Sequence, residues 1–210
     1  MPVRNTKERI LEEALTLFSK RGYDGVSVRE IAGRVGIRES AIYKHFSGKQ
    51  GIFDALLQRM QENYDQATKR MFMPSGDTAQ MVEDYGSIGL ETLSRIGELT
   101  FLYWLKDDYA ARFRRMVTIE QFHSSEAGKT YRRFFIEEVL RFQSGLFAGM
   151  MERGYFHQND PQLLAVEFYA PFFLLFHDCE GHPEKEAEAL ELLRKHMAMF
   201  AQQHQVAPKT

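Results

Sequence analysis

Residues 27–46, with the sequence SVREIAGRVGIRESAIYKHF, predict two short helices joined by a glycine turn. Ser27 and Glu30 have the spacing of a capping box, in which each side chain satisfies a backbone N–H at the start of a helix. The apolar residues that follow recur at i, i+3, i+4 and i+7, as one buried stripe requires: Val28, Ile31, Ala32 and Val35. Gly36 stands where a left-handed residue would end this helix. The pattern is typical of a helix-turn-helix unit, whose second helix enters the major groove of DNA.

The second helix, predicted over residues 38–46, has two chemically different sides when its residues are placed about 100° apart. Ile42 and Phe46 fall on one side and are expected to pack against the preceding helix. The other side carries small, polar and cationic residues, namely Arg38, Ser40, Ala41 and Lys44, with Tyr43 and His45 on its flanks. Small side chains let a backbone approach base edges, while Arg and Lys reach guanine or phosphate. This side is therefore predicted to face DNA.

The distribution of charge favours DNA binding over the alternative, a three-helix unit used only for packing. The chain has 210 residues and a formal net charge of −2. Residues 1–50 contain ten Lys and Arg against six Asp and Glu, a net charge of +4, so the remaining 160 residues carry −6. Positive charge is thus concentrated where phosphate would be bound.

Residues 9–57 resemble the DNA-binding domain of the TetR family of bacterial transcriptional regulators. The segments RILEEALTLF and GYDGVSVREIAGRVGIRESAIYKHFSGKQGIFDALL match that family's pattern in order and spacing, over about a quarter of the chain. The resemblance implies that four residues hold phosphates: Ser27, Tyr43, His45 and Lys49. It also implies that the second helix is a recognition helix, with Arg38, Ser40, Ala41 and Lys44 in the groove.

Two positions depart from the family's pattern. The family often has Ser or Thr where this chain has Arg38, so a cation replaces the usual cap of the recognition helix. Glu39 stands where a neutral or basic residue is common. Beside DNA, a carboxylate is tolerable if it turns aside or accepts a hydrogen bond from a cytosine amino group. The operator of a relative therefore cannot be transferred to this chain.

The chain is predicted to be all-α, with a helix-turn-helix domain over residues 1–48 and a helical effector-binding and dimerisation domain over 49–210. A first helix begins at Asn5 or Thr6 and stops at Gly22, and a capping box of Ser47 and Gln50 opens a fourth helix that continues to residue 72. No period-2 alternation indicates a strand beyond the break at residues 73–76. Further helices are predicted over 78–95, 98–106, 108–124, 129–153, 161–178 and 184–203.

The last two predicted helices carry more apolar surface than one subunit needs. Residues 163–177 are apolar nearly all round, whereas a surface helix has one apolar stripe. The following helix adds a stripe of its own. This surplus predicts a homodimer through a four-helix interface, which the resemblance also implies, although burial inside one subunit is the alternative. The residues expected at the interface are Phe168, Phe172, Leu175, Leu190, Leu193 and Met197.

The middle of the chain is rich in aromatic residues and methionine. Such side chains can frame an apolar cavity inside a helical bundle, although for each residue taken singly an ordinary place in the core is the favoured interpretation. The resemblance implies a pocket in this region for a small hydrophobic or aromatic effector. The candidate lining residues are Tyr85, Phe101, Trp104, Phe122, His123, Tyr131 and Phe135.

Other functional classes find little support. The sequence has no nucleophile elbow, P-loop or dinucleotide fingerprint, so neither an enzyme nor a cofactor is expected. The metal-capable residues His177, Asp178, Cys179 and His182 lack a zinc spacing, so no metal is expected. The single cysteine excludes an intrachain disulfide and fits a reducing cytoplasm. The first ten residues lack the apolar segment of a secretory signal, and the longest apolar run is too short to span a membrane.

These patterns predict a cytoplasmic, ligand-responsive regulator that binds double-stranded DNA as a homodimer. The favoured form is a repressor that a small hydrophobic or aromatic effector releases from a palindromic operator. An activator or a regulator without a ligand is the nearest alternative. The alternative from another class is a helical ligand-carrying or protein-interaction module without sequence-specific DNA binding.

Overall fold

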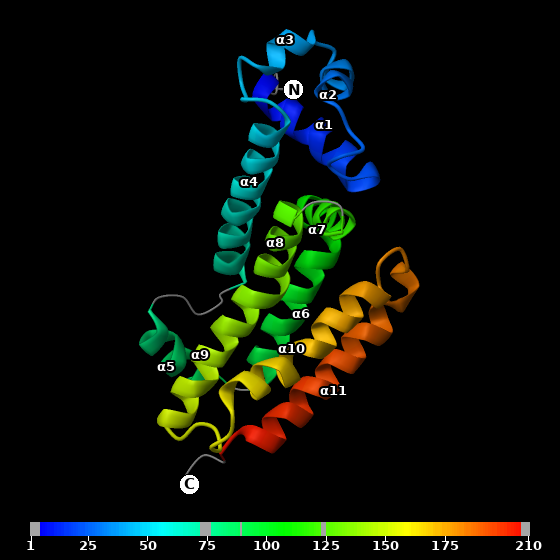
Figure 1. Ribbon diagram of the computed structural model, residues 1–210. Coiled ribbons are helices and arrows are strands. Elements are labelled where there is room, and N and C mark those ends of the chain that lie inside the picture. The colour runs from blue at the N-terminus through cyan, green and yellow to red at the C-terminus, as the bar shows by residue number, and fades with distance from the viewer. Residues whose placement is uncertain (1–4, 72–76, 89, 123–124, 207–210) are drawn as a thin grey trace. The chain divides into compact units, whose positions relative to one another are not determined.

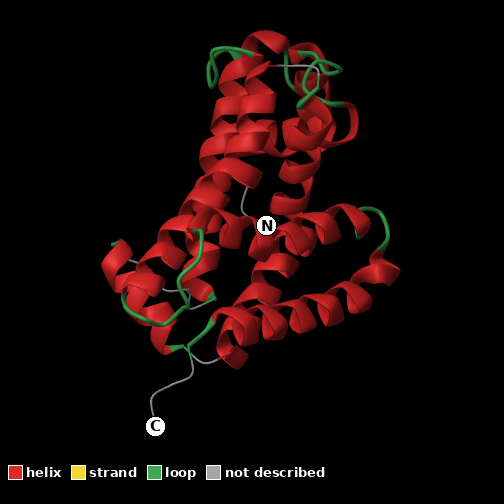
Figure 2. Ribbon diagram, turned by 60° about the horizontal axis from the view of Figure 1, so that its bottom comes forward, coloured by secondary structure: helices red, strands yellow, loops and turns green. Residues whose placement is uncertain are grey.

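A computed structural model describes residues 5–71, 77–88, 90–122 and 125–206. Within these ranges all regular secondary structure is helical, apart from one isolated bridge between Phe156 and Gln205 (Figure 2). The predicted all-α class is confirmed. The chain divides into two compact units: Met1–Ala67 with Lys106–Arg132, and Thr68–Leu105 with Arg133–Thr210.

The first unit contains the N-terminal helices and one helical hairpin from the middle of the chain (Figure 1). Its helices are α1 (Thr6–Arg21), α2 (Val28–Val35), α3 (Glu39–Ile42), α4 (Lys49–Arg70) as far as residue 67, α7 (Asp108–Glu120) and α8 (Ser125–Arg132). Its fully buried side chains include Ile10, Leu15, Phe18, Ile31, Ile42, Ile52, Leu56, Phe113 and Met116. Burial of these apolar side chains is the main force that holds the unit together.

The predicted helix ends of α1 and α2 are confirmed. The Asn5 side chain accepts a hydrogen bond from the Lys7 N–H, and Gly22 ends α1 with φ 76°. Ser27 and Glu30 form both hydrogen bonds of a capping box at α2. Gly36 ends α2 in the left-handed region, with φ 77° and ψ 34°. The local sequence signals therefore determine how these two helices begin and end.

Two expectations about the next helices are wrong. The α-helical part of the recognition helix covers only Glu39–Ile42, because residues 43–45 tighten into i→i−3 turns, such as His45 N–H to the Ile42 carbonyl at 2.9 Å. Ser47 and Gln50 do not form the reciprocal capping box. The Gln50 side chain instead accepts from the Tyr23 hydroxyl at 3.2 Å and donates to Asp54 at 2.8 Å.

Helix α7 belongs to the first unit, where polar contacts with α1 and α4 add to the burial of its apolar side chains. The Arg112 guanidinium donates to Glu12 at 2.8 Å and to the Thr16 hydroxyl at 3.0 Å. The Tyr109 hydroxyl donates to the Leu56 carbonyl at 3.0 Å, and burial raises the pKa of this tyrosine far above its ordinary value. The boundary expected at residue 48 therefore does not separate the compact units. Residues 108–120, assigned from the sequence to the second domain, pack with the helix-turn-helix.

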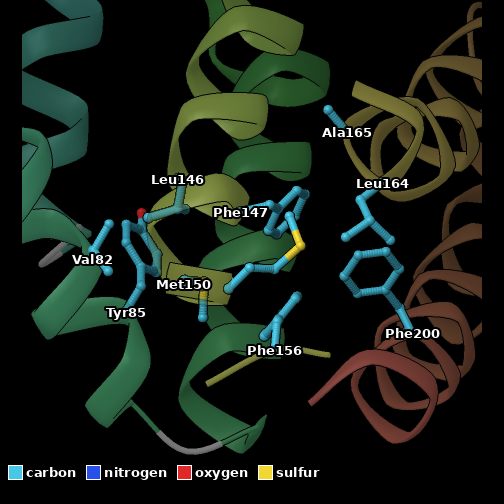
Figure 3. Close-up of a cluster of buried hydrophobic side chains, with 10 residues drawn as sticks. Val82, Tyr85, Leu146, Phe147, Met150, Phe156, Leu164, Ala165 and Phe200 are labelled. Atoms are coloured by element: carbon cyan, nitrogen blue, oxygen red, sulfur yellow. The ribbon is translucent and has the colours of Figure 1, made fainter. Parts of the chain in front are cut away.

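The second unit is built from the remaining helices. These are α5 (Thr78–Ser87), α6 (Leu90–Lys106), the π-helical turn η1 (Arg133–Glu137), α9 (Glu138–Glu152), α10 (Pro161–Asp178), the 3₁₀ turn η2 (Pro183–Lys185) and α11 (Glu186–His204). Helices α5, α9, α10 and α11 bury a common apolar cluster, which includes Val82, Tyr85, Phe147, Met150, Leu164 and Phe200 (Figure 3). Asp160 caps α10 with Pro161 at its first position, as predicted.

Several predicted helix boundaries in the middle of the chain are wrong because glycines there serve close packing. Helix α6 runs through Gly97, where a break was expected. A Cβ atom on Gly97 would lie 2.7 Å from the Met197 sulfur and 3.3 Å from the Phe172 ring. Gly128 likewise lies inside α8. Glycine can therefore mark a close helix contact as well as a helix end.

Candidate nucleic-acid interface

The recognition helix, α3 with the turn that follows it, has the two sides predicted from its sequence. Ile42 and Phe46 are buried, whereas Arg38, Ser40, Tyr43, Lys44 and His45 are exposed. Ala41 is half-buried. The angular placement of these side chains is confirmed, since the apolar pair packs inward and the polar set faces outward. Tyr43, at 57% exposure, is among the most exposed large side chains of the chain.

The exposed polar side chains of the recognition helix are uncommitted. Those of Arg38, Ser40 and Lys44 have no hydrogen bond or ion pair with any residue in the described ranges, and Arg38 does not cap α3. Neighbouring cations are engaged within the unit: Arg34 pairs with Glu13, Arg21 pairs with Glu30, and Arg9 donates to the Val35 carbonyl. Two unpaired cations, Arg38 and Lys44, therefore lie on the face that was predicted to meet DNA.

Ser27 lies at the start of α2 with an exposed hydroxyl that the capping box already orients. The hydroxyl accepts from the Glu30 N–H at 3.2 Å and donates to the Glu30 carboxylate at 2.9 Å. Hydrogen bonds from the Ser27 backbone and from Arg21 lower the pKa of Glu30 to about 2. Glu30 is thus ionised at neutral pH and fixes the start of α2.

Lys49, expected from the resemblance to hold a phosphate, is engaged inside the unit. Its ammonium donates to the carbonyls of Tyr23 at 2.9 Å and Val26 at 3.0 Å, and lies 4.1 Å from the centre of the Tyr23 ring. Two of its three donors are thereby used, and one remains for a phosphate. Lys49 ties the first turn of α4 to the α1–α2 loop, a long-range contact that the local sequence does not reveal.

A buried carboxylate that the sequence did not indicate lies against the same loop. Glu120, the last residue of α7, is 1% exposed, and its Oε1 is 3.4 Å from the Asp24 nitrogen. Its Oε2 is buried without a hydrogen-bond partner among the described residues. Glu120 therefore joins α7 to the loop that leads into the helix-turn-helix.

Arg29 is a further candidate for phosphate binding that the sequence analysis missed. It lies in the first turn of α2, close in sequence to Ser27, and is exposed. No residue in the described part of the chain pairs with it. The angular placement used for the recognition helix would have found it, because Arg29 lies off the buried stripe of α2.

The candidate effector residues that the structure describes are divided between the two compact units. Tyr85, Phe101, Trp104 and Phe135 are buried in the second unit, where Phe101 stacks on Phe176 and Trp104 meets Phe135 edge-on. Tyr131 is buried in the first unit. Phe122 is 84% exposed just beyond the end of α7, so it does not line an interior pocket. His123 lies outside the described residues.

The residues expected at the dimer interface lie mostly in the subunit's own interior. Phe172, Leu175, Leu193 and Met197 are buried, and Phe168 and Leu190 are half-buried. A different set on the same two helices is exposed, consisting of Leu163, Val166 and Leu174 on α10 and Leu192 and Met199 on α11. We call this set the α10–α11 face. The structure therefore buries most of the residues predicted at the interface and exposes other apolar residues of the same two helices, because α10 is apolar on both sides.

Within the described ranges, no three His, Cys, Asp or Glu side chains form a potential metal site. Asp178 pairs with Lys185 at 2.5 Å, and His182 lies 3.0 Å from Glu184. None of the helices described combines the length and the hydropathy required to span a membrane.

Comparison with known proteins supports the assignment of the N-terminal helices. Residues 10–56 match the family model described as bacterial regulatory proteins, tetR family. The negative transcriptional regulator IcaR of the Staphylococcus aureus (strain Newman) biofilm operon icaADBC is 29% identical over 110 residues, which are 52% of this chain and 50% of IcaR. The chain therefore spans about half the length of the curated relatives that it matches.

Solved structures resemble the chain over nearly its whole length. SmeT, the repressor of the multidrug efflux pump SmeDEF of Stenotrophomonas maltophilia, matches with a TM-score of 0.66 and 18% identity, over 98% of this chain and 93% of SmeT. SmeT in its complex with triclosan matches with a TM-score of 0.64 and 19% identity, over 97% and 93% of the two chains. At these identities the likeness shows a shared fold.

Proposed function

We infer that this chain, which belongs to the TetR family of bacterial regulatory proteins, is a homodimeric repressor that a small molecule releases from DNA. One observation carries the proposal: the recognition helix buries Ile42 and Phe46 and presents uncommitted Arg38, Ser40 and Lys44 side chains. A surface that serves only for packing gains nothing from unpaired cations. A surface that meets phosphates and guanine edges requires them.

The α10–α11 face supports a dimer formed with a second copy of the chain. Leu163, Val166 and Leu174 recur along one side of α10, and Leu174 is 67% exposed. Leu192 and Met199 are two turns apart on α11, and both are exposed. Apolar side chains clustered on two adjacent helices favour a self-complementary interface around a two-fold axis. Such a dimer presents two recognition helices to a palindromic operator, with half-sites roughly 34 Å apart.

A charged residue in the α10–α11 face is expected to weaken this dimer. Leu174→Glu places two unpaired carboxylates at the interface, one from each subunit, so dimer affinity should fall at least about tenfold. Sedimentation equilibrium of the purified full chain measures the change. Phe142→Glu on α9 is the matched control, since Phe142 is an exposed apolar residue outside the face. A Leu174→Glu variant that dimerises as tightly as the unchanged chain contradicts the assigned interface.

The proposed effector is a small hydrophobic or aromatic molecule that binds the second unit. The aromatic interior of this unit supports that chemistry, as does the triclosan complex of SmeT. The Gln143 Oε1 is buried without a hydrogen-bond partner among the described residues. It lies one turn of α9 before Phe147, a member of the apolar cluster. A hydroxyl or amino group on an effector would satisfy this oxygen.

The direct connection of α6 to α7 along the chain can transmit a movement caused by effector binding to the DNA-binding helices. Helix α6 lies in the second unit to residue 105, and α7, which follows after Asp107, packs with the helix-turn-helix. The Arg112 contacts with α1 and the Tyr109 contact with α4 hold α7 there. An effector that prefers another position of α6 therefore changes the spacing of the recognition helices. By linkage, DNA must weaken effector binding by the same factor.

Selection of bound fragments from random double-stranded DNA tests the proposal. The purified chain should recover one recurring palindrome, and its affinity for that sequence should fall steeply as the salt concentration rises, because bound phosphates release counterions. Adding triclosan or related aromatic compounds should then release the DNA. A helical carrier or protein-interaction module would recover no recurring sequence. That result would overturn the proposed function.

A further inference from the structure

Glu39 is an acidic residue at the N-terminal end of the recognition helix. It is the first residue of α3 and is exposed. Its sequence neighbours Arg38 and Ser40 are exposed as well, and the uncommitted Lys44 lies little more than one helical turn further on. In a helix-turn-helix unit the N-terminal residues of the recognition helix contact base edges, so a carboxylate at this position comes close to bound DNA and its phosphates. Like charges at short range repel, so Glu39 weakens non-specific binding unless it gains a contact in return.

The other glutamates of the first fifty residues are neutralised inside the protein. Glu8 pairs with Arg59 at 2.6 Å, Glu12 with Arg112 at 2.8 Å, Glu13 with Arg34 at 3.0 Å and Glu30 with Arg21 at 2.8 Å. Glu39 has no ion pair or hydrogen bond with a residue in the described ranges. Its carboxylate does not turn aside onto a neighbouring cation. An exposed carboxylate without a partner is available to contact a base amino group, which is one of the two arrangements that make an acid tolerable beside DNA.

The major groove offers two such amino groups, and their surroundings differ. Cytosine presents its N4 amino group without a neighbouring acceptor on the same base. Adenine presents N6 beside the N7 acceptor, whose lone pair repels a carboxylate oxygen. Thymine O4 and guanine O6 and N7 are acceptors and repel it as well. A carboxylate therefore prefers cytosine among the four bases.

We propose that Glu39 is a specificity-determining residue that accepts a hydrogen bond from the N4 amino group of one cytosine in each half-site. This inference rests on the proposed function, because it requires that the recognition helix binds DNA. Glu39 lowers affinity for random sequence by repelling phosphate. It restores affinity at the correct site, where the amino group offsets the repulsion. The residue thus widens the difference between specific and non-specific binding.

The test compares the DNA sequences that are selected by the unchanged full-length chain, Glu39→Gln and Glu39→Ala. The unchanged chain should select cytosine at one position of each half-site. Glu39→Gln should select adenine there, since an amide both accepts from N6 and donates to N7. Glu39→Ala should lose its preference at that position by at least about tenfold. It should also bind random duplexes more tightly, because one negative charge is gone. Every other position of the site should stay the same in both variants.

Control measurements keep the outcomes distinct. Glu91→Gln neutralises an exposed glutamate on α6 and should leave the selected sequence unchanged. Thermal unfolding should show that Glu39→Gln and Glu39→Ala are as stable as the unchanged chain, because the exposed carboxylate pairs with no residue in the described ranges. If the unchanged chain selects no recurring sequence, the proposed function fails. If it selects a palindrome that both Glu39 variants select equally well, only the role of Glu39 is overturned.

Discussion

Gly22→Ala is expected to lower the free energy of unfolding by about 3 kcal/mol. Gly22 has φ 76° and ψ 168°, a region of backbone conformation that is open almost only to glycine. A Cβ atom at this position would also overlap the Glu120 Oε1 and lie 3.2 Å from the Ile119 side chain. The variant must therefore strain the turn and displace a buried carboxylate at the same time. Chemical denaturation of the purified chain measures the change.

A second glycine provides the matched control for Gly22. Gly33 lies inside α2 with ordinary helical geometry, and a Cβ atom there would meet nothing within 4 Å. Gly33→Ala should therefore raise the free energy of unfolding by up to about 1 kcal/mol, since alanine favours a helix more than glycine does. If both variants changed stability by the same small amount, the special geometry of Gly22 would be refuted.

A double-mutant cycle separates strain from steric overlap at Gly22. Glu120→Ala removes the carboxylate that the new methyl group would meet. In that background Gly22→Ala should keep only the part of its destabilising effect that comes from the backbone conformation, because the steric overlap is gone. A coupling energy close to zero would show that Glu120 moves away freely. It would also show that the contact between α7 and the α1–α2 loop is loose.

Tyr43→Ala and Lys44→Ala should each weaken binding to the selected DNA between about 30-fold and 1,000-fold. Each substitution removes one interaction with DNA from both half-sites of a dimer, and a well-formed interaction contributes about 1 to 2 kcal/mol. Both side chains are exposed, so the free energy of unfolding should change by less than about 0.5 kcal/mol. Fluorescence anisotropy at several salt concentrations measures the affinity together with the number of phosphates that the protein neutralises.

The salt dependence distinguishes a specific interaction from a general loss of positive charge. Lys44→Ala should reduce the slope of log affinity against log salt by about one for each phosphate that the lysine neutralises. Lys69→Ala removes an exposed lysine from the last turn of α4 and should leave both slope and affinity nearly unchanged. Full retention of binding by both Tyr43→Ala and Lys44→Ala would remove the recognition-helix assignment.

Sequence patterns predicted helix ends correctly where the hydrogen bonds that form each end join residues close together in the chain. The capping box of Ser27 and Glu30, the left-handed Gly36 and the start of α10 at Asp160 depend on residues within one turn of each other. The buried side of the recognition helix also followed from its own periodicity. The same reasoning failed at Gly97 and Gly128, because the atoms that require glycine there come from other turns or other helices.

The amino-acid sequence alone determined the class of fold, the helix-turn-helix and the residues that it turns outward, because helix periodicity and capping are properties of a few adjacent residues. Only the tertiary structure decided that α7 belongs with the DNA-binding helices. It also decided that Lys49 donates two hydrogen bonds to the α1–α2 loop and that Glu39 pairs with no residue in the described ranges. It also decided which side of α10 is exposed. These features depend on contacts between residues far apart in the chain. Periodicity identifies an apolar or charged side, but only packing selects what that side contacts.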